Sequence, residues 1–132
     1  MSAVCAASFV IACSSDHKTT RLVPAENATA AIGEVTTSIG ENGNTNMRVK
    51  VTFLAPPDKL SPGASTYVVW VKPDAKAAAQ NVGALRVKND RSGELDTKTA
   101  LTSFDVVITP EAAATVTEPA GAPAMTGRVS ST

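Results

Sequence analysis

The chain has 132 residues and a mass of 13.5 kDa, which is enough for one domain with its own core and too little for two. Twelve Lys and Arg residues balance twelve Asp and Glu residues. The chain therefore lacks the basic excess with which nucleic-acid-binding proteins neutralise phosphates. Val and Thr number 15 and 16, whereas Leu and Ile together number 10. Because Val and Thr suit pleated, half-buried strands, the composition predicts a small all-β domain.

The first segment, residues 1–13, has the pattern of a lipoprotein signal. Residues 3–12 carry no charge, and this run is far shorter than the roughly 20 apolar residues of a membrane-spanning helix. The sequence from Val10 to Ser14 resembles a bacterial lipobox, which implies cleavage after Ala12 and lipidation of Cys13. Met1-Ser2 departs from the pattern, because no basic residue precedes the run. The alternative is that Cys5 and Cys13 are small hydrophobes in a buried strand.

The lipobox resemblance implies an exported protein that is lipid-anchored in the cell envelope. Ser14, in place of Asp after the cysteine, fits release to an outer membrane where the host has one. Residues 14–30 are polar, small and without period, which predicts a linker that extends at most about 55 Å. His17 lies in this predicted linker.

Residues 31–129 show the period of two that is typical of strands. Four apolar residues alternate with polar ones from Met47 to Phe53, and residues 32–39 form a plausible partner strand. Asn42-Gly43 between them is a strong hairpin signal. Further strands are expected at residues 66–71, 84–88, 94–97, 103–109 and 127–129, with another hairpin loop at residues 89–93. This pattern predicts one antiparallel, immunoglobulin-like β-sandwich of six to eight strands.

The alternation also predicts the core. Residues 67–71 are apolar on both faces, so the alternation does not decide which face points into the core. The inward residues are either Tyr67, Val69 and Val71 or the pair Val68 and Trp70. The other core positions follow from the period of two. The predicted core is Val49, Val51, Phe53, Val69, Val71, Leu85, Phe104, Val106 and Ile108.

Three short motifs in the second half carry a family resemblance. They are Tyr67-x-x-Trp70, the strand from Phe104 to Thr109-x-Glu111, and Glu118-Pro119-Ala120-Gly121. Together they resemble the extracytoplasmic domain of anti-sigma factors of the anti-sigma-K type, with Ala122 where that family has a second glycine. The resemblance implies an envelope-side β domain. It does not extend to sigma-factor binding, because residues 1–30 show neither the cytoplasmic segment nor the spanning helix that this activity requires.

Candidate chemical sites are few. Trp70 is expected in the core rather than in a sugar-stacking platform, since the chain has only five aromatic residues. Asp90, Glu94 and Asp96 surround one hairpin without the spacing of an EF-hand loop, which favours a solvated hairpin over a Ca²⁺ site. The single His17 and the lack of a G-x-S-x-G motif predict no catalytic residue. No cofactor and no metal site are expected.

We therefore expect a non-enzymatic, lipid-anchored envelope protein whose β domain binds a protein or a surface component. The alternative is a structural subunit or stalk module that self-assembles through sheet edges.

Overall fold

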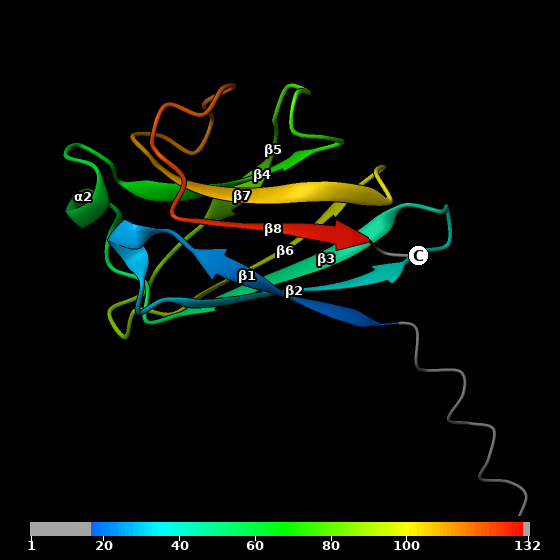
Figure 1. Cartoon of the computed structure of the whole chain (residues 1–132), viewed down its shortest axis with the longest axis horizontal. Helices are drawn as coiled ribbons and strands as arrows, with labels where there is room; N and C mark the ends of the chain where they lie inside the picture. The colour runs from blue at the N-terminus through cyan, green and yellow to red at the C-terminus, as the bar shows by residue number, and fades with distance from the viewer. Residues whose placement is uncertain (1–16, 131–132) are drawn as a thin grey trace, which may run out of the picture.

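The structure is a computed structural model and describes residues 17–130 (Figure 1). Eight strands form one antiparallel sheet in the order β5-β4-β7-β8-β1-β2-β3-β6, which confirms the all-β prediction. A 3-10 turn, η1 (Glu26–Ala28), and one short helix, α2 (Pro57–Leu60), lie in the connections. The strands are β1 (Lys18–Pro24), β2 (Ile32–Ile39), β3 (Thr45–Thr52), β4 (Thr66–Lys72), β5 (Gln80–Leu85), β6 (Gly93–Thr99), β7 (Ser103–Glu111) and β8 (Met125–Ser130).

The sheet curls until its two edge strands, β5 and β6, approach each other. The Thr97 hydroxyl of β6 donates a hydrogen bond of 2.8 Å to the Val82 carbonyl oxygen of β5. Near the other end of β6, a Cβ at Gly93 would lie 2.5 Å from the Arg86 carbonyl oxygen, so only glycine allows this approach. The domain is therefore a single sheet nearly closed into a barrel, and the prediction of an immunoglobulin-like sandwich is wrong.

Strand β1 is the reason that two sheets become one. Residues Lys18 to Leu22 pair with β2, and Val23 and Pro24 pair with β8. Residues 18–24 lie within the predicted linker of residues 14–30 and form a strand instead. Only Leu22 of this strand is buried, so β1 lacks the alternation that reveals the other strands.

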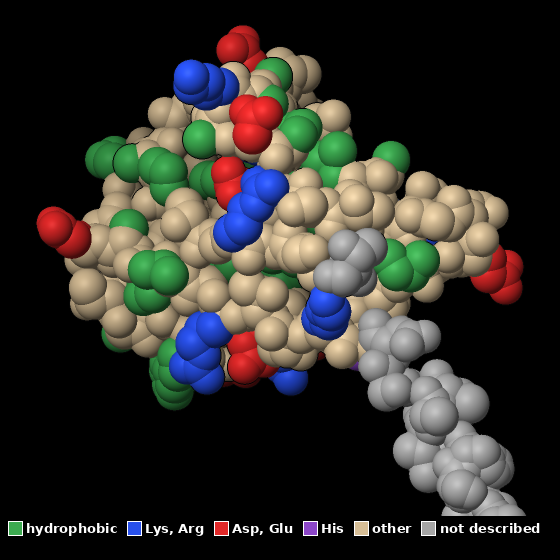
Figure 2. Space-filling model, turned by 45° about the vertical axis from the view of Figure 1, so that its right-hand side comes forward, with side chains coloured by type: hydrophobic (Ala, Val, Ile, Leu, Met, Phe, Trp, Pro, Cys, Tyr) green, Lys and Arg blue, Asp and Glu red, His purple; other side chains and the backbone are tan. Residues whose placement is uncertain are grey.

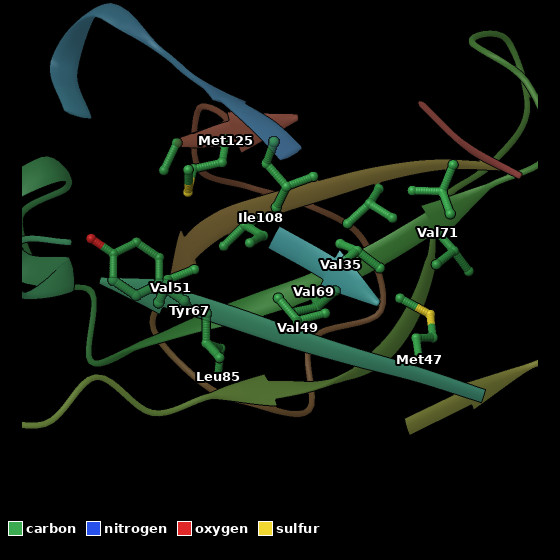
Figure 3. Close-up of a cluster of buried hydrophobic side chains, with 14 of the residues drawn as sticks. Val35, Met47, Val49, Val51, Tyr67, Val69, Val71, Leu85, Ile108 and Met125 are labelled. Carbon is green, nitrogen blue, oxygen red and sulfur yellow. The ribbon is translucent and has the colours of Figure 1, made fainter. Parts of the chain in front are cut away.

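Apolar side chains fill the interior of the barrel. Figure 3 shows Val35 of β2, Val49 of β3, Tyr67 of β4 and Ile108 of β7 pointing toward one another. Of the nine predicted core residues, all except Phe53 are buried. Phe53 is 61% exposed, because its φ of +58° ends the alternation of β3 and Leu54 takes the next buried position.

Strand β4 is buried on both faces. Tyr67, Val69 and Val71 belong to the interior core, which resolves the open register. Val68 and Trp70 are also fully buried although they lie on the outer face. The loop of residues 112–124, between β7 and β8, folds back over this outer face (Figure 1).

The two expected hairpins have different outcomes. Between β2 and β3, the Gly40 N–H donates to the Asn44 carbonyl oxygen at 2.7 Å and Gly43 has a φ of +81°, as the Asn42-Gly43 signal predicts. Residues 89–93 also turn, but the strands on either side do not pair with each other. Strand β5 pairs with β4, whereas β6 pairs with β3, so this connection crosses the seam of the barrel.

Candidate functional site

A buried carboxylate fastens the loop of residues 112–124. Glu111 at the end of β7 is 2% exposed. Its Oε2 accepts hydrogen bonds from the Thr109 hydroxyl at 2.6 Å and from the Ala120 N–H at 3.0 Å, and from the Gly121 N–H at 3.3 Å. The Trp70 Nε1–H donates to the Thr109 hydroxyl at 2.8 Å. The indole and the carboxyl group are thereby satisfied although both are buried.

Two further features hold the same loop. The Asn81 side-chain amide donates to the carbonyl oxygens of Ala114 and Val116 at 2.9 and 2.8 Å. A Cβ at Gly121 would collide with the Pro110 carbonyl oxygen, so the close approach of loop and strand requires glycine. The loop is therefore fixed at several points on the outer face of β4, β5 and β7.

The residues that carry the family resemblance meet around this network. Trp70, Thr109, Glu111, Ala120 and Gly121 fasten the loop. These residues therefore have a structural role here. Trp70 is fully buried, which is expected of a core residue and not of a sugar-stacking platform. Tyr67 points into the barrel, where its hydroxyl donates to the Ala55 carbonyl oxygen at 2.6 Å, and burial raises the pKa of Tyr67 to about 12.

The acidic residues around the turn at residues 89–93 have separate neighbours. The Asp90 carboxylate accepts bonds from the Ser92 hydroxyl and N–H at 2.7 and 3.1 Å, which lower the pKa of Asp90. Glu94 pairs with Lys50 in the β3–β6 register. Among residues 17–130, no three His, Cys, Asp or Glu side chains gather into a metal-binding group. Cys13 lies outside the described residues.

A polar hollow of about 450 Å³ lies on the outer face of β2, β3 and β6. Its charged centre is an ion pair, in which Arg48 Nε and Nη2 donate to the two Asp96 carboxylate oxygens at 2.7 and 3.2 Å. The hydrogen bond from Arg48 lowers the pKa of Asp96. The charges of this pair cancel, which leaves Lys98 as the remaining cation of the lining. Its other lining residues are His17, Thr36, Ser38, Asn46, Met47, Thr97 and Lys98.

The end of the barrel that carries α2, which we call the α2 end, has a row of exposed apolar side chains. Val23 is 65% and Ile32 41% exposed. The pairing of Leu22 with Gly33 brings Val23 beside Ile32, and Ile32 pairs with Thr52, the residue before Phe53. Figure 2 shows basic, acidic and hydrophobic side chains interspersed over the face that it presents. The row is distinguished by its continuity across the ends of β1, β2 and β3.

Backbone strain coincides with this row. Phe53 and Arg91 have φ values of +58° and +65°, and among the described residues no other non-glycine residue has a positive φ. The two are neighbours in space, because the Leu54 N–H donates to the Arg91 carbonyl oxygen at 3.1 Å. Such conformations cost about 1–3 kcal/mol each and gather at functional sites. The coincidence marks the α2 end as a candidate binding surface.

Three cationic side chains lie near the apolar row at the α2 end. Arg86, Lys88 and Arg91 lie in the segment that crosses the seam, and within the described part of the chain none forms an ion pair. Arg86 lines a hollow of about 470 Å³, together with Pro57, Thr66 and Val87 among others. This hollow therefore combines one unpaired cation with hydroxyl and apolar groups.

Sequence reasoning missed Phe53 and Arg91 as surface candidates, because a positive φ in a non-glycine residue leaves no direct trace in a sequence. The one available signal is that Phe53 and Leu54 are both apolar and adjacent, which breaks the period of two and requires one of them to leave the core.

Comparisons of this chain with protein-family models, with curated proteins and with solved structures found no match.

Proposed function

We propose that this protein is a non-enzymatic, lipid-anchored bacterial envelope protein whose β-barrel binds a protein or a surface component. The anchor is the lipidated Cys13 that the lipobox resemblance implies. The observation that carries the proposal is the position of β1, which begins at Lys18. Five residue steps from Cys13 span at most about 17 Å, so the anchor would hold the barrel close to the membrane surface.

The short tether gives the barrel a preferred orientation. The first and last described strands place Lys18 and Ser130 at one end of the barrel, and α2 lies at the opposite end (Figure 1). An anchor at Cys13 therefore directs the α2 end, with its exposed apolar row and unpaired cations, away from the membrane. That end is the surface that a partner in the envelope would meet first. In the part of the chain that the structure describes, no helix is long and apolar enough to cross a membrane.

The filled interior supports binding at the outer surface. Small barrels that hold a ligand keep an internal cavity, whereas here apolar side chains occupy the space between the strands. The near closure of the seam between β5 and β6 also leaves less edge for pairing with another chain. We therefore favour surface binding over self-assembly through sheet edges.

The anchor is tested by fractionation of cells that express the wild-type chain or Cys13→Ser. The wild-type protein is expected in the membrane fraction, with an intact mass that shows cleavage after Ala12 and added acyl chains. Cys13→Ser should fold equally well and move to the soluble fraction. A membrane-bound Cys13→Ser variant, or a wild-type protein that keeps Met1 or Ser2, would contradict the anchor.

Binding is tested in the same cells with a photoreactive amino acid placed at single exposed positions on both ends of the barrel. A discrete adduct from a subset of positions supports a binding module. Equal, diffuse labelling from every position contradicts it. Sedimentation of the purified chain at micromolar concentration checks the alternative, because a self-assembling subunit would sediment as an oligomer.

A further inference from the structure

We propose that the α2 end docks an acidic, partly apolar segment of another envelope protein. Phe53 would contact an apolar side chain of that segment, and Arg86 and Arg91 would bind its carboxylates. The inference rests on the proposed function, since it names the surface and the partner chemistry of the same binding module. It is carried by three separate observations, which are exposure, strain and charge.

The exposed apolar row has the composition of an interface centre. Phe53 is the largest exposed hydrophobic side chain among the described residues, and Val23 and Ile32 continue the row across β1 and β2. Aromatic residues and arginine are enriched in the buried centres of protein interfaces. Phe53 and Arg91 provide this combination on adjoining segments.

Strain at Phe53 and Arg91 indicates that these side chains have a use. Glycine would adopt both backbone conformations without steric cost, as Gly43 and Gly63 do with φ values of +81° and +87°. Neither side chain packs in the core, because both residues are exposed. A strained side chain that contributes nothing to the core fits a binding site, because such strain clusters at functional sites.

The charge of this surface selects the partner. In the segment that crosses the seam, Arg86, Lys88 and Arg91 outnumber Asp90, whose carboxylate is already bonded to Ser92. Elsewhere at this end, α2 carries Asp58 and Lys59 and η1 carries Glu26, so the cations keep only a small excess that is concentrated in the seam segment. Glu94 follows in β6, opposite Lys50 of β3. A carboxylate that entered the hollow beside Arg86 could accept two parallel hydrogen bonds from the guanidinium group. An acidic protein segment is therefore the fitting occupant.

An anionic lipid surface would have similar chemistry, but the geometry disfavours it. Strand β3 has eight residues and is about 27 Å long at roughly 3.4 Å per residue. With the anchor at the opposite end of β1, the α2 end meets the membrane only when the barrel lies on its side. A partner in the envelope does not have this restriction.

The test uses the full chain with Cys13→Ser, isotope-labelled for NMR. The probes are a short peptide that alternates glutamate with leucine and phenylalanine, its counterpart with glutamine for every glutamate, and vesicles of phosphatidylglycerol and phosphatidylethanolamine. The acidic peptide is expected to shift the amide signals of residues 52–54 and 86–92, and the glutamine peptide to bind about fivefold or more weakly.

Substitutions that keep the backbone conformation provide the controls. Arg91→Gly and Phe53→Asn both tolerate a positive φ, and each should weaken the acidic peptide about fivefold or more while the remaining spectrum stays folded. Ile39→Asn and Lys98→Gln remove an exposed apolar residue and a cation far from α2, and should leave affinity unchanged.

Four results would each overturn the inference. They are equal binding of both peptides, shifts centred on Arg48 and Lys98, absence of binding, and tighter binding to the vesicles than to the acidic peptide. None of these results depends on the anchor or on adducts formed in cells. The proposed function can therefore stand when this inference fails.

Discussion

The two sides of the barrel differ in whether their outward side chains are exposed or buried. On β3, the outward side chains of Asn46, Arg48 and Lys50 lie at the surface, whereas on β4 the outward Val68 and Trp70 are fully buried. The loop of residues 112–124 makes the difference, because Glu111 holds it over β4 and β7. We call these the open side (β2, β3 and β6) and the covered side (β4, β5 and β7).

This difference shows how a loop can replace a second sheet. In a sandwich, the outward Trp70 would pack on an opposing sheet, but here a loop without regular structure covers the indole. Such a cover buries backbone polar groups, which must be hydrogen-bonded. Glu111 and Asn81 supply these bonds to the loop, and the Thr109 hydroxyl links the Trp70 indole to the Glu111 carboxylate. The covered side therefore depends on a few polar contacts, whereas the open side depends on strand pairing and the core beneath it.

The largest expected effect is the loss of the indole on the covered side. Trp70→Ala removes a fully buried side chain and leaves the Thr109 hydroxyl without its donor, which should lower the free energy of unfolding by about 4 kcal/mol. Urea unfolding followed by circular dichroism measures it. Ser38→Ala on the outer face of β2 is the matched control and should change stability by less than about 0.5 kcal/mol. Similar effects from the two substitutions would remove the distinction between the sides.

The second effect concerns the fastening of the loop. Glu111→Ala leaves the Ala120 and Gly121 N–H groups and the Thr109 hydroxyl without their acceptor, and we expect a loss of about 2 kcal/mol. Thermal unfolding measures the change. Glu118→Ala, an exposed residue of the same loop, is the control with little effect. A stability of Glu111→Ala that equals that of Glu118→Ala would show that the loop does not depend on the carboxylate.

A smaller effect, of opposite sign, is expected where the open side meets the α2 end. Arg91→Gly relieves a left-handed conformation at an exposed position, so the free energy of unfolding should rise by about 1 kcal/mol. The reverse change at a residue with φ of +81°, Gly43→Ala, should lower it by a similar amount. Urea midpoints of the two variants give both values. A destabilised Arg91→Gly would mean that the arginine side chain supports the fold rather than a partner.

The smallest effect is the pH dependence of the ion pair on the open side. The hydrogen bond from Arg48 holds the pKa of Asp96 below its ordinary value. The pair therefore contributes stability above the unfolded pKa of about 3.9, and this contribution is lost as the pH falls through the lower, folded pKa. Asp96→Asn should make the free energy of unfolding depend slightly less on pH below about pH 4. Around pH 7 it should shift that free energy by a constant amount without changing its dependence on pH. An unaltered acid slope would contradict the assignment.

The open side could largely be predicted from the sequence. Alternation identified β2 and β3, and the Asn42-Gly43 pair located the turn between them. The same alternation occurs in sandwiches and in barrels, so it could not decide between them. Strand β1 decides it, and β1 is nearly invisible because Leu22 is its only buried residue.

The covered side was harder to predict because its determinants are not periodic. Residues 67–71 are apolar on both faces, which hides their register until the covering loop is known. The motif residues Trp70, Thr109 and Glu111 were recognised from a resemblance, but their shared role as a fastening network depends on contacts between segments far apart in the chain. The α2 end depends on two backbone conformations that the sequence does not reveal.

Amide hydrogen exchange at Ala120 and Gly121 tests most directly the claim that a fastened loop closes the covered side. Ala120 lies at the surface, so an unfastened loop would exchange its N–H as fast as an exposed turn residue such as Asn42. Because Glu111 accepts both N–H groups, the account predicts exchange that is slower by at least about tenfold, with the protection lost in Glu111→Ala. Exchange of Ala120 and Gly121 at the rate of Asn42 in the wild-type chain would contradict it.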